Sequence, residues 1–74
     1  MSRLGNISGK KAVRAFERAG WIFKGQVGSH VILIKQGEKA NLSVPQNKEL
    51  GIGILRKLIQ HSGLSVDEFQ DLLK

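Results

Sequence analysis

The chain has 74 residues with no cysteine and two histidines, and its 12 Lys and Arg against six Asp and Glu give a formal net charge of +6. This length suits one small domain, so we expect a single domain over residues 1–74. Disulfides and cysteine-based zinc sites are excluded, and the histidines show no metal-ligand spacing, so neither a metal nor a cofactor is expected. No apolar run reaches bilayer length and residues 1–6 lack the apolar core of a secretory signal, which predicts a cytoplasmic protein with no membrane partner.

The positive charge is concentrated in the first half of the chain. Residues 1–35 contain seven Lys or Arg and one acidic residue, whereas residues 61–74 contain three acidic residues and one Lys. A basic half on so small a domain favours a polyanionic partner, most simply nucleic acid, whose binding weakens as salt rises. A solvated surface with a basic bias explains the same charges equally well, so composition leaves both interpretations open.

Residues 9–20 predict the first helix. Ser8 stands at the N-cap position, Val13 and Phe16 lie on one side of the helix, and Gly20 suits the left-handed residue that ends it. Three cations at i, i+3 and i+7 share another face: Lys11, Arg14 and Arg18. This stripe can contact phosphates, although solvated cations on a helix face are the commoner explanation.

Residues 21–45 predict a three-stranded antiparallel meander. The segment WIFK (21–24) predicts a short strand, GQVG (25–28) a glycine-bounded turn, and SHVILIK (29–35) a longer strand. After a turn at QGE, the segment KANLSVP (39–45) predicts a third strand that ends at the proline. Trp21 and Phe23 could stack on bases, but in a chain with four aromatic residues we expect the core to claim both.

Alternation in the second strand does not show which of its faces is buried. Val31 and Leu33 share one face, whereas His30, Ile32 and Ile34 share the other. The environment of His30 therefore stays open at this point.

Two helices are expected after the strands. The segment IGILRKLIQHSG (52–63) carries apolar residues at helical spacing and ends at a glycine. Ser65 then precedes Glu68 by three residues, which is the pattern of a capping box, and Leu64 can contact Phe69 as a hydrophobic staple. The order of helix, three strands, helix and short terminal helix predicts an α+β fold, with a three-stranded antiparallel sheet and the helices on one face.

Four sequence features, in this order, resemble one known family. They are AGW after the first helix, GSH at the start of the second strand, LSVP at the end of the third, and LRKLIQHSGLSVDEF (55–69) near the end of the chain. From Ser8 to Leu73 the chain resembles the HicA toxins, small RNA-cleaving proteins of bacterial and archaeal toxin–antitoxin pairs. The resemblance implies a fold similar to double-stranded-RNA-binding domains, an endoribonuclease (mRNA interferase) that acts on mRNA, and a HicB-like antitoxin that covers the site.

The resemblance also makes His30, within GSH, the candidate catalytic residue. Metal-free RNA cleavage requires one proton to be taken from a ribose 2′-hydroxyl and another to be returned to the leaving oxygen. Histidine side chains suit this work because their unperturbed pKa is about 6.5, and one such group contributes roughly 10²- to 10⁴-fold, which implies a slow enzyme. Without the resemblance, GSH would be interpreted as a turn followed by an exposed strand residue.

Further residues are expected to bind RNA around His30. Lys24 and Lys35 are expected to hold the phosphate, Gly28 to let RNA approach the backbone, and Ser29 to orient the imidazole or contact a phosphate oxygen. Many HicA proteins carry a second histidine just after the proline that ends the third strand, where this chain has Asn47 nearby. Asn47 can hydrogen-bond a phosphate or ribose but cannot transfer protons near neutral pH, so a slower enzyme or mainly a binding protein is implied.

Two other functions remain open on the sequence. One is a non-catalytic RNA-binding module of the same fold, and the other is a protein-interaction domain that uses the terminal helix over residues 64–73. His61 is left out of the site, because an imidazole in the last turn of a helix is favoured by the helix dipole and needs no catalytic role.

Overall fold

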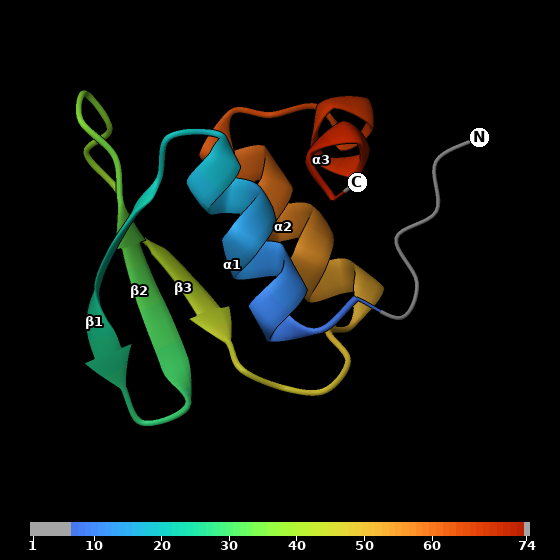
Figure 1. Ribbon diagram of the computed structural model, residues 1–74, viewed down its shortest axis with the longest axis horizontal. Coiled ribbons are helices and arrows are strands. Elements are labelled where there is room, and N and C mark those ends of the chain that lie inside the picture. Colours follow the sequence, from blue (N-terminus) through green and yellow to red (C-terminus); the bar gives the residue numbers. More distant parts are fainter. Residues whose placement is uncertain (1–6, 74) are drawn as a thin grey trace.

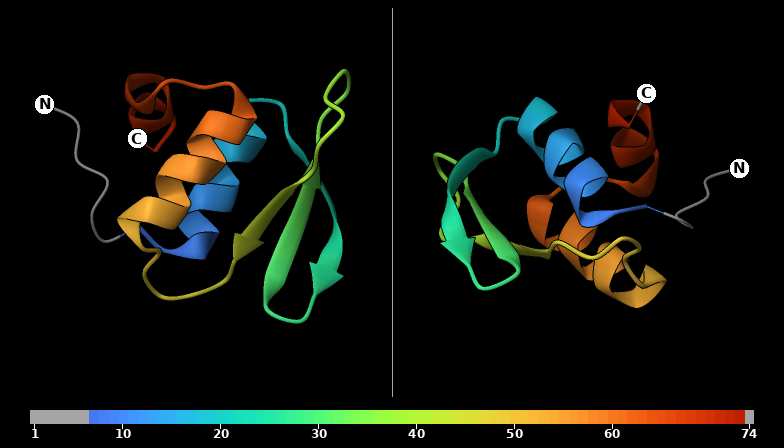
Figure 2. Two further views of the ribbon diagram at one scale, coloured as in Figure 1. Left: turned by 180° about the vertical axis from the view of Figure 1, so that it is seen from behind. Right: turned by 60° about the horizontal axis from the view of Figure 1, so that its bottom comes forward.

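A three-stranded sheet lies beside three helices in the computed structural model, which describes residues 7–73. The N-terminal segment examined for a secretory signal therefore lies outside the described residues. The elements are α1 (Gly9–Arg18), β1 (Ile22–Val27), β2 (His30–Ile34), β3 (Leu42–Pro45), α2 (Ile52–Ser62) and α3 (Val66–Leu72). Figures 1 and 2 show all three helices on one side of the sheet. The expected α+β fold, its order of elements and the single helical layer are confirmed.

Local capping residues define the ends of the helices as the sequence predicts. The Ser8 hydroxyl accepts the Lys11 N–H at 3.1 Å at the start of α1, and Gly63 ends α2 in the left-handed conformation with φ 82°. At α3, the Ser65 hydroxyl accepts the Glu68 N–H at 3.1 Å while the Glu68 carboxylate accepts the Ser65 N–H at 2.8 Å. This reciprocal pair is the expected capping box. No helix within residues 7–73 has the length and apolar character needed to cross a bilayer.

The strands form an antiparallel sheet in the order β1-β2-β3. A two-residue turn, Gly28 and Ser29, joins β1 to β2 and is closed by the Val27–His30 pair. Gly28 has φ 59°, which L side chains rarely adopt, and a glycine at the first position of a two-residue hairpin loop is typical of a tight turn that matches the strand twist.

The predicted turn over residues 25–28 is wrong, because β1 continues to Val27. Between Phe23 and Gly25 the pairing register shifts by one residue, so Lys24 is the extra residue of a β-bulge. Glycine inside a strand often marks such a bulge rather than a turn, since its lack of a side chain tolerates the local bend. The third strand is also shorter than predicted and begins at Leu42.

Burial shows which face of β2 meets the helices. Val31 and Leu33 are buried, as are Leu42 and Val44 opposite them on β3, and these residues form the inner face of the sheet. His30, Ile32 and Ile34 therefore lie on the outer face, which points away from the helices. The question that alternation left open is settled by packing: two buried side chains on β2 place the histidine on the open side.

The core lies between the inner face and the helices, with Phe16 of α1 and Phe69 of α3 at its centre. Their ring centroids are 5.1 Å apart at an interplanar angle of 46°, and both side chains are fully buried. Trp21 is buried as expected, but the prediction for Phe23 is wrong, since its side chain is 52% exposed. Phe23 points to the inner face opposite Leu33, yet α1 and α2 contact β3 at the other edge of the sheet and leave this part of β1 open (Figure 1).

The start of α1 is held against the segment that follows β3. The Gly9 N–H donates to the Asn47 carbonyl at 3.0 Å, and the Leu50 N–H donates to the Ile7 carbonyl at 2.7 Å. A Cβ at Gly9 would overlap the Pro45 carbonyl oxygen and lie 2.8 Å from the Gln46 Cα, so only glycine allows this close approach of backbone to backbone.

We expect Gly9→Ala to lower the free energy of unfolding by about 1–3 kcal/mol, because the added methyl group forces α1 away from the end of β3. Urea denaturation measures this change. Gly53→Ala in α2 is the matched control, since a Cβ there meets nothing within 4 Å, and it should unfold at or above the wild-type midpoint. Equal midpoints for Gly9→Ala and the wild type would contradict the close packing at Gly9.

Candidate functional site

His30 is the first residue of β2 and stands exposed on the outer face, between Val27 of β1 and Pro45 of β3. Its Nδ1 lies 3.2 Å from the hydroxyl oxygen of Ser43, the neighbouring outer-face residue of β3. A hydroxyl can donate to or accept from a ring nitrogen, so Ser43 can hold the imidazole in either protonation state. This contact leaves Nε2 as the ring nitrogen available to a ligand.

Ser43 was not among the predicted site residues. Alternation alone places it outside β3, but its contact with His30 depends on the register of β2 against β3, which aligns Ile32 with Ser43 and His30 with Pro45. Ser43 lies within the LSVP motif, so the sequence marked this segment but did not indicate that the serine contacts His30.

The turn before His30 is tied down on both sides. The Gln26 side-chain amide donates to the Gly28 carbonyl at 3.0 Å, and the Gln46 N–H donates to the Ser29 carbonyl at 2.7 Å. Gly28 and Ser29 are both exposed and directly precede His30. The second bond also fixes the turn to the chain that leaves β3.

Lys24 reaches the same face as His30. The outer face has an open hollow with a volume of about 430 Å³, lined by Lys24, Gly25, Gln26, Val27, Ile32 and Asn41. Val27 pairs directly with His30, and Ile32 follows it by two residues on the same face, so the hollow adjoins the imidazole. Lys24 therefore lines the hollow itself, whereas His30 adjoins the hollow through its pair with Val27.

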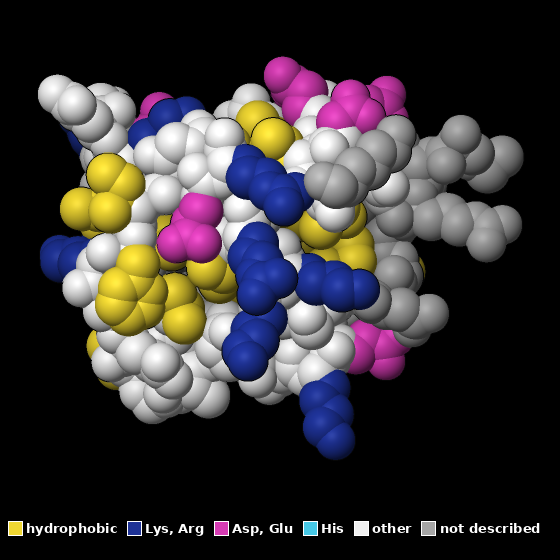
Figure 3. Space-filling view, in the orientation of Figure 1, with side chains coloured by type: hydrophobic (Ala, Val, Ile, Leu, Met, Phe, Trp, Pro, Cys, Tyr) yellow, Lys and Arg dark blue, Asp and Glu magenta, His cyan; other side chains and the backbone are white. Residues whose placement is uncertain are grey.

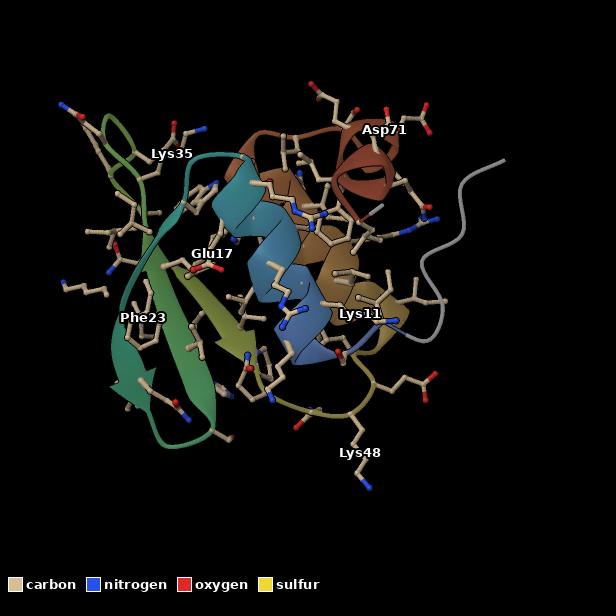
Figure 4. All side chains as sticks on the ribbon, in the orientation of Figure 1. Lys11, Glu17, Phe23, Lys35, Lys48 and Asp71 are labelled. Atoms are coloured by element: carbon tan, nitrogen blue, oxygen red, sulfur yellow. The ribbon has the colours of Figure 1, made fainter. Side chains whose placement is uncertain are left out.

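Lys35 is not brought to His30. It follows the last residue of β2, five residues from His30 and therefore roughly 16 Å away along the strand. Its side chain is half-buried and lies beside Gly20, just after α1: a Cβ added to Gly20 would be 3.4 Å from the Lys35 Cε. Figure 4 shows Lys35 at the end of the sheet opposite the β1–β2 turn.

The cations of α1 lie on a different face from His30. Lys11 and Arg14 are exposed, and in Figure 3 a column of Lys and Arg side chains runs over α1 on a face where no histidine is visible. Arg18 has a structural partner, because its guanidinium donates to the Leu72 carbonyl at 2.6 Å and so binds one of the free carbonyls that end α3. All three cations of the predicted stripe are thus exposed, and Arg18 also joins α1 to α3.

Asn47 lies at the N-terminal end of α1. It lines a second hollow with Ser8, Lys10, Gln46 and Lys48, and its backbone carbonyl accepts the Gly9 N–H. Lys10 and Lys48 were not predicted as site residues, because they are far apart in sequence and meet only where the chain after β3 returns to α1. Figure 4 shows Lys48 on this loop, away from the body of the domain. Within residues 7–73, no three His, Asp or Glu side chains gather as a metal site.

A family model described as the HicA toxin of bacterial toxin-antitoxin matches residues 9–64. The chain belongs to the HicA toxin family. The matched range covers α1, the whole sheet and α2, includes His30, and stops before α3. Its place as the HicA toxin of a toxin–antitoxin system is thereby established.

A solved structure is also similar to this HicA chain. It is titled "Toxin-Antitoxin complex from Streptococcus pneumoniae"; the matching chain is 29% identical with a TM-score of 0.70, over 77% of this chain and 97% of that chain. A comparison with curated proteins found no match.

We expect Arg18→Ala to lower the free energy of unfolding by about 0.5–1.5 kcal/mol, because the end of α3 loses the hydrogen bond to Leu72. Arg14→Ala removes the same charge from the same helix without that contact and is the matched control. Urea denaturation compares the two, and amide exchange should be faster in α3 for Arg18→Ala alone. Identical stability and exchange in both variants would show that Arg18 does not hold α3.

Proposed function

We propose that this HicA toxin is a metal-independent endoribonuclease that cleaves mRNA, with His30 as its general acid and base, and that a HicB-like antitoxin neutralises it. The observation that carries the proposal is the exposed imidazole of His30, which contacts Ser43 through Nδ1 and adjoins a lysine-lined hollow through Val27. A group that only filled space in the sheet would need neither the exposure nor the hydroxyl partner.

The reaction follows from the free ring nitrogen. Nε2 of His30 takes the proton from a ribose 2′-hydroxyl, whose oxygen attacks the adjacent phosphorus. The bond from phosphorus to the 5′-oxygen breaks, and the imidazolium returns its proton to that leaving oxygen. The products are a 2′,3′-cyclic phosphate and a 5′-hydroxyl. Ser43 supports the ring in both states, and Lys24 supplies positive charge on the same face as the negative charge grows on the phosphate.

A single histidine implies a slow enzyme. One positioned acid or base contributes roughly 10²- to 10⁴-fold to the rate. The outer face around His30 presents Ser43, Ile32 and Ile34, none of which transfers protons near neutral pH, and Asn47 lies at the end of α1 instead of beside the ring. We infer that this toxin cleaves many transcripts slowly and does not turn over rapidly.

The RNA backbone is held mainly by charge. Lys11 and Arg14 are exposed on α1, and Asn47 lies between Lys10 and Lys48, so an RNA strand that reaches His30 can continue around the end of the domain to these cations. Contacts to phosphate carry little sequence information and weaken with salt. Gly28 and Ser29 extend the proposed RNA surface beside His30, and Arg18 and Lys35 contact phosphates further from the site of cleavage.

We place the antitoxin on the outer face, over His30. The similar solved structure is a toxin–antitoxin complex, and the net charge of +6 on this chain suits an acidic partner. The outer face also exposes apolar side chains, with Ile22 60% and Val27 72% exposed, next to the imidazole. A partner that buries these side chains excludes RNA from His30 at the same time.

A non-catalytic RNA-binding module is the second candidate. It is favoured because the other histidine among the described residues 7–73, His61, lies on α2 and not on the outer face of the sheet. In that case the imidazole, Lys24 and the cations of α1 contact phosphate and ribose without cleavage. The two functions differ in what His30 is needed for: cleavage in the first, a share of affinity in the second.

We expect wild-type protein to cleave a long mRNA in the presence of EDTA and His30→Ala to cleave it at least about 100-fold more slowly while still binding it, because only the proton-transfer group is lost. The readouts are gel analysis of the products, with their cyclic-phosphate ends, and filter binding. His61→Ala, which removes an exposed imidazole from α2, is the matched control and should cleave at the wild-type rate. Equal cleavage by His30→Ala and the wild type would refute the catalytic role, and RNA binding without cleavage by the wild type would favour the binding module.

A further inference from the structure

The hollow on the outer face has the composition of a small-molecule site. Its lining combines the apolar residues Val27 and Ile32 with the polar residues Lys24, Gln26 and Asn41. Its volume of about 430 Å³ falls within the range of ligand sites, roughly 300–1,000 Å³. A few polar groups around an apolar surface are what fixes the orientation of a bound ring system.

Gly25 lines the hollow and adds no side chain to it. Gly25 pairs directly with Ile32 on the outer face, where the neighbouring positions of β1 carry Ile22 and Val27. The bulge at Lys24 is one reason for a glycine at this position. Gly25 does not have a left-handed φ, and a Cβ there would meet no atom within 4 Å, so a side chain at this position has room and would occupy part of the hollow.

The hollow is adjacent to the place where the proposed reaction occurs. Val27 forms part of its lining and is also the ladder partner of His30, while Ile32 is the next outer-face residue after His30 on β2. Side chains two residues apart on a strand are separated by roughly 7 Å. A nucleotide whose phosphate contacts His30 can therefore place its own base, or that of its neighbour, over Ile32.

We propose that this hollow binds one unpaired nucleobase of the RNA next to the phosphate that is cut, an inference that rests on the proposed function. The face of the base lies on Val27 and Ile32, the Asn41 carboxamide pairs with the edge of the base through one donor and one acceptor, and Lys24 contacts the phosphate of the same nucleotide. The toxin thereby reads one base at the site of cleavage, whereas the cations of α1 read none. Single-stranded RNA is the substrate class, because a base inside a duplex cannot leave its stack without cost.

Gly25→Val tests the proposal by filling the hollow. The fold should be retained, because the new side chain has room and suits a strand, and circular dichroism and thermal unfolding check this. We expect cleavage of a short single-stranded RNA to fall roughly 10- to 100-fold, because a base that loses its apolar contact no longer holds the neighbouring phosphate in position at His30. Gly53→Ala, on α2 and away from the hollow, is the control and should cleave normally.

An RNA with one abasic ribose beside the mapped cleavage site separates base binding from a general defect. The wild type should cleave this RNA as slowly as Gly25→Val cleaves the intact one, and Gly25→Val should lose nothing further on it, because both changes remove the same contact. Asn41→Ala, which leaves the backbone of the hollow unchanged, should alter the preference among RNAs that differ only at this base.

Two results would overturn the proposal. In the first, Gly25→Val cleaves the intact RNA at the wild-type rate. In the second, Gly25→Val is slower than the wild type by the same factor on the intact RNA and on the abasic RNA. If Gly25→Val fails to fold, Asn41→Ala serves as the test, and an unchanged preference among bases in that variant would also overturn the proposal. Absence of cleavage by the wild type on every RNA is a different outcome, since it removes the proposed function itself.

Discussion

The register of β2 is the constraint on which the site depends. Val31 and Leu33 must enter the core, and because side chains alternate along a strand, His30 must then face away from it. A shift of one residue would exchange Val31 and Leu33 for Ile32 and Ile34 in the core and would bury the imidazole of His30 with them. Burial of an unpaired polar ring is costly, so the observed register also specifies the position of the candidate catalytic group. The Gly28–Ser29 turn fixes this register on the β1 side, and the Ser29–Gln46 backbone hydrogen bond fixes it on the β3 side.

The unequal cover of the sheet gives the domain its open surfaces. The helices contact β3 and leave β1 exposed on both faces, with Phe23 open on the inner side and Ile22 and Val27 on the outer side. An exposed edge strand can pair with a strand of another molecule and so promote aggregation. The bulge at Lys24 opposes such pairing, because it twists the strand and adds a charge to it. The same bulge and the adjacent Gly25 create the hollow beside His30, so one irregularity of β1 serves both solubility and the proposed recognition of RNA.

Helix ends and strand order could be predicted because their signals are local. Ser8, Gly63 and the Ser65–Glu68 pair act within a few residues of their own positions, and each is found in its predicted role. The wrong predictions concern two kinds of position. In one, the residue type is common in two different structures, and in the other, burial depends on an element far away in the sequence. Gly25 indicates a turn and a bulge equally well, and the exposure of Phe23 depends on how far the helices extend across the sheet.

The candidate site was only partly accessible from sequence for the same reason. His30 could be singled out through its family resemblance, but its Ser43 partner depends on strand register. The separation of Lys35 from His30 follows from the length of the predicted strand and could have been foreseen. Arg18 illustrates the limit of helical spacing as evidence. Its position on the stripe with Lys11 and Arg14 is correct, whereas its hydrogen bond to Leu72 depends on the docking of α3, 54 residues further along the chain.

The central claim is that RNA binds to the outer face with a ribose at His30, and the most direct test is an NMR titration with 2′-O-methylated RNA, which lacks the attacking hydroxyl and cannot be cut. We expect the largest chemical-shift changes at His30 and its outer-face neighbours Ile32 and Ser43, with smaller changes along the cations of α1. Changes confined to α1, with His30 and the outer face unaffected at saturation, would contradict it.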